Sequence, residues 1–489
     1  MQRSMTPDTQ ALQNYVAGRF VDSNASEFIT FYNPAFAEPL GKVPVTPREE
    51  VSAAVEAALA GFEAIRKMPA TERVKLLLRI RGLMERDADK LARVLVDNHG
   101  RTYSEGLGEV RRSIENVESA AALAYTYAKG ENMPNVSPGV DQTLIREPLG
   151  VFAIITPFNI PLHAWSSYVP YAIALGCSVV LKPSEITPLI SNEIFRIMHE
   201  AGVPEGVVNL VHGGPSVVEQ LVKHRDVKGV GFIGSTRTGR LLYRMAAEEG
   251  KRASINAGAK NYIVVMPDAD REKTVGALVS SFFGMCGQRC LAGSNLVLVG
   301  GNDELLSRFV EASNLRLGYG MDSDVDMGPL VSATALERVR SYVERGEAEG
   351  AKLLLDGRKN RPVKPLKGYF IGPTIFADVS PDMTIAREEI FGPVASVITC
   401  EKLDEAIEYI NKKTPYGNAA AIFTSNAREA RRFALEVDVG NVGINVGIPQ
   451  PMAYFPIGGR RESFFGGAHS RVDTIRFFTD HKIIVSRWL

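Results

Sequence analysis

The chain has 489 residues, of which 45% are hydrophobic and 23% are charged. It is too long for one hydrophobic core and should divide into two or three folding units. Lys and Arg together number 56, and so do Asp and Glu, which excludes a general electrostatic attraction for nucleic acid or an anionic membrane. Residues 1–10 lack the apolar core of a secretory signal, and the most apolar stretch, residues 168–181, is too short to span a bilayer. Because four cysteines make no disulfide framework, we expect a cytoplasmic protein.

Helices and strands alternate along the first half of the chain. Residues 46–68 begin with a capping box formed by Thr46 and Glu49 and continue as an amphipathic helix, and residues 70–100 predict a second long helix. Strands that end in turns follow at residues 150–159, 177–185, 206–214 and 228–250, the last of these leading into a helix. This order predicts an α/β protein with a largely parallel sheet, which binds its ligand outside the carboxyl ends of the strands.

The pattern restarts after Asn256, where residues 261–270 predict a strand with a cysteine-bearing helix behind it. We therefore expect one α/β unit over residues 1–129 and 149–256 and a second over residues 257–454. Residues 130–148 and 470–489 fit neither unit and have the composition of strands. An isolated hairpin is marginal in water, so pairing across a subunit interface is the simplest explanation for these two segments.

The stretch FFGMCGQRCLAGSN holds two of the four cysteines, Cys286 and Cys290. No His or Cys cluster with metal-ligand spacing accompanies them, so no metal site is expected. A lone cysteine is more often a small buried hydrophobe, which suits Cys177, Cys286 and Cys400. Cys290 differs because Arg289 places a permanent cation beside it, which favours the thiolate and predicts a nucleophile.

The same stretch resembles the nucleophile motif of the aldehyde dehydrogenase superfamily, and the resemblance covers essentially the whole chain. TPFNIP is similar to the family's oxyanion-hole segment, LKPSE to its ribose clamp, GFIGSTRTG to its cofactor loop, EEIFGPV to its nicotinamide-side motif and PIGGRRES to its late glycine turn. The resemblance implies the aldehyde dehydrogenase fold. In that fold residues 1–129 and 149–256 form a Rossmann-like NAD-binding domain, residues 257–454 an α/β catalytic domain, and residues 130–148 and 470–489 a small β oligomerisation domain of a homodimer or homotetramer.

The resemblance also assigns catalytic roles. Cys290 attacks the aldehyde, and the resulting oxyanion is bound by the side chain of Asn159 and the backbone N–H of Cys290. Loss of hydride to the nicotinamide then leaves a thioester on the enzyme. Without the motif, Asn159 would be read as a turn residue after Pro157.

The resemblance implies NAD as cofactor. Lys182 and Glu185 would bind the adenosine ribose, and the carboxylate of Glu185 repels a 2′-phosphate, which favours NAD over NADP. Gly234 and Ser235 would face the pyrophosphate at a helix N-terminus. The full set of implied cofactor residues is Thr156, Phe158, Lys182, Glu185, Gly234, Ser235, Glu389 and Phe391. Taken singly, Lys182, Glu185 and Glu389 are ordinary surface residues, and Phe391 an ordinary core residue.

The sequence departs from that of the hydrolytic members of the superfamily at a residue that acts in the second half of the reaction, the release of the acyl group. Hydrolytic members of the superfamily carry a glutamate that activates water, and the matching stretch here, NAGAKN, has Asn256 at that place. Asn is no proton acceptor near neutral pH, whereas a thiol such as coenzyme A ionises near pH ~8.5 and needs no strong base. The alternative is hydrolysis with Glu389 as the base.

NAGAKN, YIVVMPDAD and GQRC together are similar to the methylmalonate-semialdehyde dehydrogenase subfamily. That resemblance implies oxidative decarboxylation of malonate or methylmalonate semialdehyde to acetyl- or propionyl-CoA. Arg289 and Arg112 would bind the substrate carboxylate, since guanidinium groups hold a carboxylate bidentately. Arg111 is better read as part of a solvated helix face, and His163 as a packing residue.

Two other readings compete with this one. The first is a hydrolytic NAD(P)-dependent aldehyde dehydrogenase that converts another aldehyde to the free acid. The second is a non-catalytic protein built on the same scaffold, such as some lens crystallins, which the presence of Cys290 and Asn159 disfavours.

Overall fold

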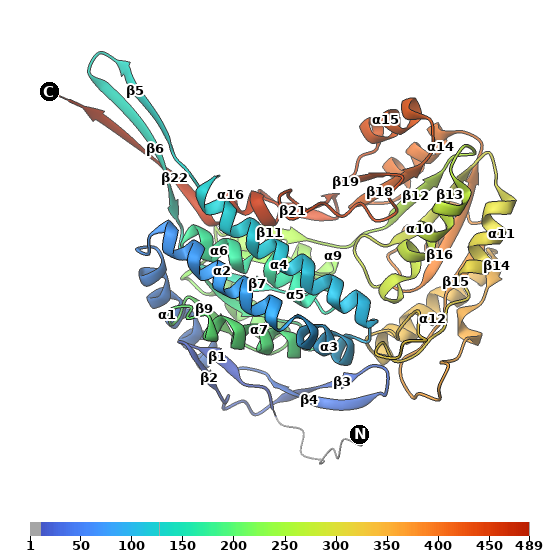
Figure 1. Ribbon diagram of the computed structural model, residues 1–489, viewed down its shortest axis with the longest axis horizontal. Helices are drawn as coiled ribbons and strands as arrows, with labels where there is room; N and C mark the ends of the chain where they lie inside the picture. The colour runs from blue at the N-terminus through green and yellow to red at the C-terminus, as the bar shows by residue number, and fades with distance from the viewer. Residues whose placement is uncertain (1–10, 127, 489) are drawn as a thin grey trace.

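The computed structural model describes residues 11–126 and 128–488. Residues 1–10, on which the prediction about a secretory signal rests, lie outside this range. Two α/β units lie side by side, and a narrow three-stranded sheet extends away from the first (Figure 1). Within the described ranges no helix combines the length and apolar character that a bilayer crossing requires.

The first unit is built on an eight-stranded sheet with the order β2-β1-β9-β8-β7-β10-β11-β21, in which the strands from β9 to β11 run parallel. Its strands are β1 (Asn14–Val16), β2 (Arg19–Val21), β7 (Val151–Ile155), β8 (Ser178–Lys182), β9 (Val208–Leu210), β10 (Val227–Ile233), β11 (Arg252–Asn256) and β21 (Phe464–Gly466). Helices cover both faces, so Phe152 and Ile154 enter one hydrophobic cluster while Val151 and Ala153 enter another. This is why β7 is a continuous apolar run.

The helices around this sheet are α1 (Arg48–Ile65), α2 (Ala70–Arg86), α3 (Ala88–His99), α4 (Tyr103–Tyr125), α5 (Pro161–Ser166), α6 (Val169–Leu175), α7 (Leu189–Glu200), α8 (Pro215–Lys223) and α9 (Thr236–Glu248). Two predictions are wrong here. Residues 70–100 form two helices, because Asp87 leaves the helical region with φ −97° and ψ 13°. Thr46 does not cap α1, because its hydroxyl donates to the His212 carbonyl at 2.7 Å; a capping box occurs instead at Thr102 of α4.

The second unit has a seven-stranded sheet with the order β14-β15-β16-β13-β12-β18-β19, parallel except for β14. Its elements are α10 (Arg271–Phe283), α11 (Asp303–Ala312), α12 (Ala333–Ala348), α13 (Thr384–Arg387), α14 (Leu403–Glu408), α15 (Ala427–Glu436), β12 (Asn261–Val265), β13 (Gly293–Val299), β14 (Lys352–Leu355), β15 (Thr374–Ala377), β16 (Val394–Cys400), β18 (Ala419–Phe423) and β19 (Asn441–Ile444). The expected cysteine-bearing helix is wrong for Cys290, which lies in a turn after α10 has ended at Phe283.

The third sheet joins β5 (Glu131–Ser137), β6 (Val140–Pro148) and β22 (Thr479–Arg487). The prediction that these segments need a partner from another subunit is wrong, because β22 pairs with β6 along its full length within one chain. The sheet still exposes Met133, Ile483 and Val485 to solvent. The smaller elements are β3 (Phe28–Asn33), β4 (Glu38–Pro44), β17 (Tyr416–Gly417), β20 (Arg460–Arg461) and α16 (Ile475–Phe478).

Candidate active site

Cys290 lies in the turn that precedes β13, and two asparagines hold its backbone in place. The Cys290 carbonyl accepts hydrogen bonds from Nδ2 of Asn261 at 2.8 Å and from Nδ2 of Asn418 at 2.7 Å. Asn261 begins β12 and Asn418 precedes β18, so two neighbouring strands of the second sheet fix the turn. The side chain lies at the wall of a cleft between the two units.

Burial raises the pKa of the Cys290 thiol to about 11, and the negative charge of Glu389 acts in the same direction. Backbone N–H groups lower the pKa, and Arg289 lowers it by a smaller amount. Arg289 therefore favours the thiolate, as predicted, but burial and the charge of Glu389 outweigh its effect in the protein without cofactor. The Arg289 guanidinium lies 3.0 Å from the Glu105 carboxylate, which offsets its charge.

Asn159 is buried and connects the two sides of the site. Its Nδ2 donates to the carbonyl of Gln288 at 3.0 Å, two residues before the nucleophile. Gln288 is itself fixed, because its Oε1 accepts from the N–H of Val331 at 3.1 Å. The amide nitrogen carries a second N–H, so Asn159 can hold the nucleophile loop and bind an oxyanion at Cys290 at the same time.

A buried ion pair fixes the backbone of Asn159. Arg101 pairs with Glu109 of α4 and donates from Nη2 to the Asn159 carbonyl at 2.5 Å. The other carboxylate oxygen of Glu109 accepts the N–H groups of Leu162 and His163 at 2.9 Å, at the start of α5. The sequence reading missed Arg101 and Glu109, because the spacing of two charged residues around a helix start does not show that they are buried.

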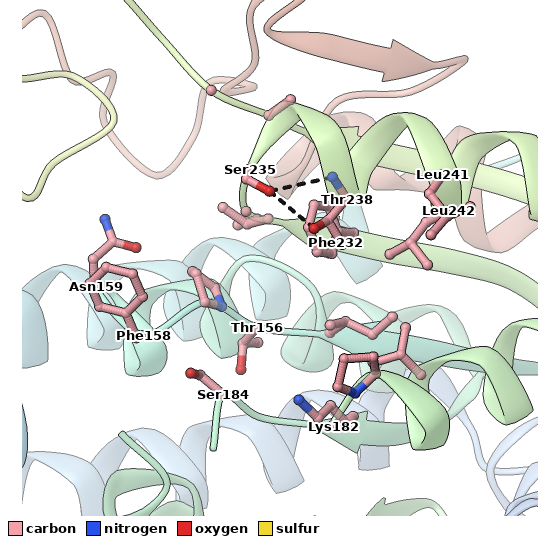
Figure 2. A pocket seen from close by; sticks show the side chains of 18 of the residues that line it. Thr156, Phe158, Asn159, Lys182, Ser184, Phe232, Ser235, Thr238, Leu241 and Leu242 are labelled. Carbon is pink, nitrogen blue, oxygen red and sulfur yellow. Dashed lines mark hydrogen bonds between the residues drawn. The ribbon is translucent and has the colours of Figure 1, made fainter. Parts of the chain in front are cut away.

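The cleft has a volume of about 460 Å³ and is formed by the carboxyl ends of β7, β8 and β10, the first turns of α9 and the loop of Glu389. In Figure 2, Lys182 and Ser184 lie across the cleft from Ser235 and Thr238, with Asn159 at one end. All eight residues predicted to bind the cofactor line it. Residues that were not predicted complete the apolar wall, namely Pro215, Val218, Leu241, Leu242 and Met245. Pro215 and Val218 lie on α8 and the other three on α9, and their only signal in the sequence was the apolar character of those positions.

The two ends of the cleft differ in chemistry. At one end Nζ of Lys182 lies 2.8 Å from a Glu185 oxygen, and the Ser235 hydroxyl caps α9 by accepting the N–H of Thr238 at 3.3 Å. At the other end Glu389 accepts the N–H of Ala259 at 2.8 Å, and burial raises the pKa of its carboxyl group.

Phe391 lies beside Glu389 in the left-handed region, with φ 56°. Its ring packs edge-on against Phe158 with the ring centroids 5.8 Å apart. Residues held in sparsely populated backbone conformations cluster at active sites and ligand-binding segments.

Asn256, the last residue of β11, is hydrogen-bonded to a buried tyrosine. Its Nδ2 donates to the Tyr168 hydroxyl at 3.0 Å, and that hydroxyl also lies 3.0 Å from Oγ of Ser254. Tyr168 is 1% exposed, and burial raises its pKa to about 12. Asn256 is thus tied to a neutral, buried hydrogen-bond network.

Of the two predicted carboxylate-binding arginines, neither lines the cleft. Arg112 is exposed on α4, as is Arg111, while Arg289 is held by Glu105. Arg112 nevertheless lies near enough to Arg289 to lower its pKa. Within the described ranges, no group of three or more His, Cys, Asp or Glu residues is arranged to hold a metal ion.

The sequence profile of the aldehyde dehydrogenase family matches residues 20–484. The chain belongs to this family. It is 43% identical to malonate-semialdehyde dehydrogenase 2 of Geobacillus kaustophilus, over 99% of this chain and 100% of that protein. Its structure superposes on a putative methylmalonate-semialdehyde dehydrogenase from Sinorhizobium meliloti complexed with NAD, with TM-score 0.97 and 36% identity, covering 100% of this chain and 99% of that one.

A second solved structure, methylmalonate-semialdehyde dehydrogenase from Oceanimonas doudoroffii, superposes with TM-score 0.96 and 37% identity, covering 98% of this chain and 99% of that one. These matches confirm the predicted α/β aldehyde dehydrogenase fold and the resemblance to the semialdehyde dehydrogenases. The chain is an aldehyde dehydrogenase, so the non-catalytic reading is not retained.

Modification of the nucleophile should depend steeply on pH. Iodoacetamide should alkylate Cys290 about tenfold faster for each pH unit above neutrality, because only the thiolate reacts and its pKa is about 11. Mass spectrometry of the Cys290 peptide from cofactor-free protein gives the rate, with the buried Cys177 and Cys400 as internal references. A rate that stops rising below about pH 9 would contradict the raised pKa.

The buried ion pair between Arg101 and Glu109 predicts that Glu109→Gln strongly destabilises the protein. Removing the carboxylate charge leaves Arg101 buried and unpaired, which should lower the free energy of unfolding by about 3–5 kcal/mol. Glu118→Gln on the same helix is the matched control, because its partner Arg81 is 35% exposed and the loss should stay under about 1 kcal/mol. Urea titration of both variants measures their free energies of unfolding. Equal losses in the two variants would contradict the stabilising role of the Arg101–Glu109 ion pair.

Proposed function

We propose that the enzyme oxidises a carboxylate-bearing semialdehyde, malonate or methylmalonate semialdehyde, with NAD as cofactor. A Cys290 thioester then loses CO2 and transfers its acyl group to coenzyme A, giving acetyl-CoA or propionyl-CoA. The observation that carries this proposal is the amide of Asn256, which is held by buried Tyr168 where the hydrolytic enzymes have a glutamate. The names of the relatives support the substrate class.

The residues of the cleft fit NAD. A helix N-terminus with free N–H groups suits a pyrophosphate, and the backbone there is close-packed, since a Cβ on Gly234 would lie 2.4 Å from the Phe232 ring. Lys182 and Glu185 would hold the adenosine ribose, and the Glu185 charge opposes a 2′-phosphate. Thr156, Phe158, Glu389 and Phe391 would surround the nicotinamide, which accepts a hydride when it is bound.

The protein's own groups can then carry out acylation. The Cys290 sulfur forms a bond to the aldehyde carbon, and the carbonyl oxygen becomes an oxyanion bound by Asn159 and the Cys290 N–H. Loss of hydride from that carbon restores the carbonyl as a thioester. The proton that leaves the thiol needs an acceptor, and Glu389 is the titratable group whose charge acts most strongly on Cys290.

The acyl acceptor follows from Asn256. Its amide has no proton affinity near neutral pH, so it cannot prepare water for attack, whereas a thiol acceptor is itself acidic enough to ionise. Decarboxylation of the thioester would give an enolate that the same oxyanion donors stabilise. The second candidate, hydrolysis to the free acid, draws support from Glu389, whose buried carboxyl group has a raised pKa and is the alternative base.

We also propose the position of the substrate carboxylate, the assembly, the roles of the domains and the location of the protein. The substrate carboxylate would lie near Arg112 and Arg289, on the side of Cys290 away from the cofactor cleft. The apolar residues exposed on the β5–β6–β22 sheet would be covered in a homodimer or homotetramer. The segments 1–129 with 149–256, 257–454, and 130–148 with 470–489 would act as NAD-binding, catalytic and oligomerisation domains. The four free thiols suit the cytoplasm.

Coenzyme A should be required for steady-state turnover. Malonate semialdehyde and NAD alone should give a burst of NADH close to one equivalent of active sites, followed by a rate at least about tenfold lower than with coenzyme A. Stopped-flow absorbance measures both phases. The same steady-state rate with and without coenzyme A would refute the acyl-transfer proposal and favour hydrolysis.

Restoring a carboxylate at Asn256 should open the hydrolytic route. Asn256→Glu should increase turnover without coenzyme A on the order of 10²-fold, the lower range for a positioned general base. Asn256→Gln is the control, because it lengthens the side chain equally and adds no base. If both variants behave alike in NADH formation without coenzyme A, the residue does not decide the acceptor.

A further inference from the structure

Arg471 is a buried cation that none of the motifs predicted. Its side chain is 1% exposed, and it lies just before α16 with φ 64°, in the left-handed region that L-residues rarely adopt. Burying a guanidinium and holding its backbone in this region both cost free energy. Residues that persist under such costs are concentrated at functional sites.

The partners of Arg471 are all neutral. Its Nη1 donates to the carbonyls of Pro451 at 2.9 Å and Met452 at 3.0 Å, and its Nη2 lies 3.0 Å from Nε2 of His163. Nε is buried without a partner among the described residues. Because a guanidinium only donates, Nε2 of His163 must accept, so this histidine is neutral. Burial and the charge of Arg471 hold the pKa of His163 well below its ordinary value.

Two other arginines near Cys290 differ from Arg471, because each of them pairs with a carboxylate. Arg101 is paired with Glu109, and Arg289 with Glu105. No carboxylate in residues 11–126 and 128–488 forms an ion pair with Arg471. The Glu115 carboxylate raises the pKa of Arg471 without pairing with it. Arg471 therefore presents a buried positive charge that no described carboxylate contacts directly, in a low-dielectric interior where charges act more strongly and over longer distances.

The position of Arg471 connects it with the acyl side of the reaction. His163 follows Asn159 by four residues and is held by the same Glu109 carboxylate. The next residue of the loop that Arg471 binds, Ala453, accepts a hydrogen bond from Ser119 of α4, the helix of Arg112. Neither Arg471 nor His163 lines the cofactor cleft. Burial lowers the pKa of Arg471 to about 10, and the charges of Arg112, Glu115 and Cys290 act on it more weakly.

We propose that Arg471 is a specificity-determining residue whose buried charge, not paired with any described carboxylate, selects aldehydes that carry a carboxylate. This rests on the proposed function and deepens it: Arg471 acts on the substrate anion through its field, while Arg289 is largely committed to Glu105. A buried charge is screened much less by salt than an exposed one. The preference for an anionic aldehyde should therefore survive high ionic strength, which it would not do if exposed Arg112 were its source.

The test compares kcat/KM for malonate semialdehyde with kcat/KM for propanal. In Arg471→Gly, which also relieves the positive φ, the ratio should fall by about 30-fold or more, as expected for loss of a charge interaction in the interior. Arg471→Lys should keep most of the ratio. Arg461→Gly is the matched control, because Arg461 also has a positive φ, 53°, and also donates to backbone carbonyls. Arg461→Gly should lower the melting temperature and keep the wild-type ratio of the two kcat/KM values.

Other outcomes would overturn the inference. A ratio in Arg471→Gly within about threefold of the wild type, even with both rates reduced, would show that Arg471 only supports the loop. If that variant does not fold, Arg471→Gln carries the same test. In the wild type, a ratio that collapses between about 0.05 M and about 1 M KCl would assign the preference to exposed charges. The dependence of turnover on coenzyme A is measured separately and tests the proposed function. If turnover requires coenzyme A but Arg471→Gly keeps the wild-type ratio of kcat/KM values, only the inference about Arg471 is refuted.

Discussion

The geometry of the active site depends on the buried ion pair between Arg101 and Glu109. Both residues are nearly inaccessible to solvent, so neither charge is stable there without the other. Together they fix the carbonyl of Asn159 and the first N–H groups of α5. Asn159 is therefore oriented by the fold itself, which is the condition for the electrostatic stabilisation of an oxyanion that we propose for it.

The segment that carries Arg101, between α3 and α4, also connects the two units. The N–H of Tyr103 donates to the Gly320 carbonyl at 2.8 Å, and a Cβ on Gly328 would lie 1.7 Å from the Gly100 oxygen. Glu105 then bridges to the nucleophile loop, accepting the Met285 N–H at 2.6 Å and pairing with Arg289. Cys290 and Asn159 come from different units, and these contacts fix their relative positions.

Sequence patterns predicted the parts of the site that depend on local chemistry. Strand ends followed by glycine or proline turns located the cleft, and each residue assigned to the cofactor lies on it. The missed residues act through burial and long-range pairing. Arg101 and Arg471 look like surface residues in the sequence, and the direction of the Asn256 side chain depends on Tyr168, 88 positions away. Burial of the Cys290 thiol, which outweighs the effect of Arg289 on its pKa, also depends on the tertiary structure.

The pKa values suggest how protons are handled in the two half-reactions. Burial raises the pKa of both Cys290 and Glu389, and the negative charge of either one opposes ionisation of the other. The resting site therefore favours at most one negative charge, and a proton released by the thiol can be taken up at Glu389 with no net change. A second thiol that enters the site meets the same constraint. Asn256 adds no acceptor, so in the mechanism that we propose Glu389 would receive the proton in both steps, and the acidity of the incoming acceptor would decide whether the second step proceeds.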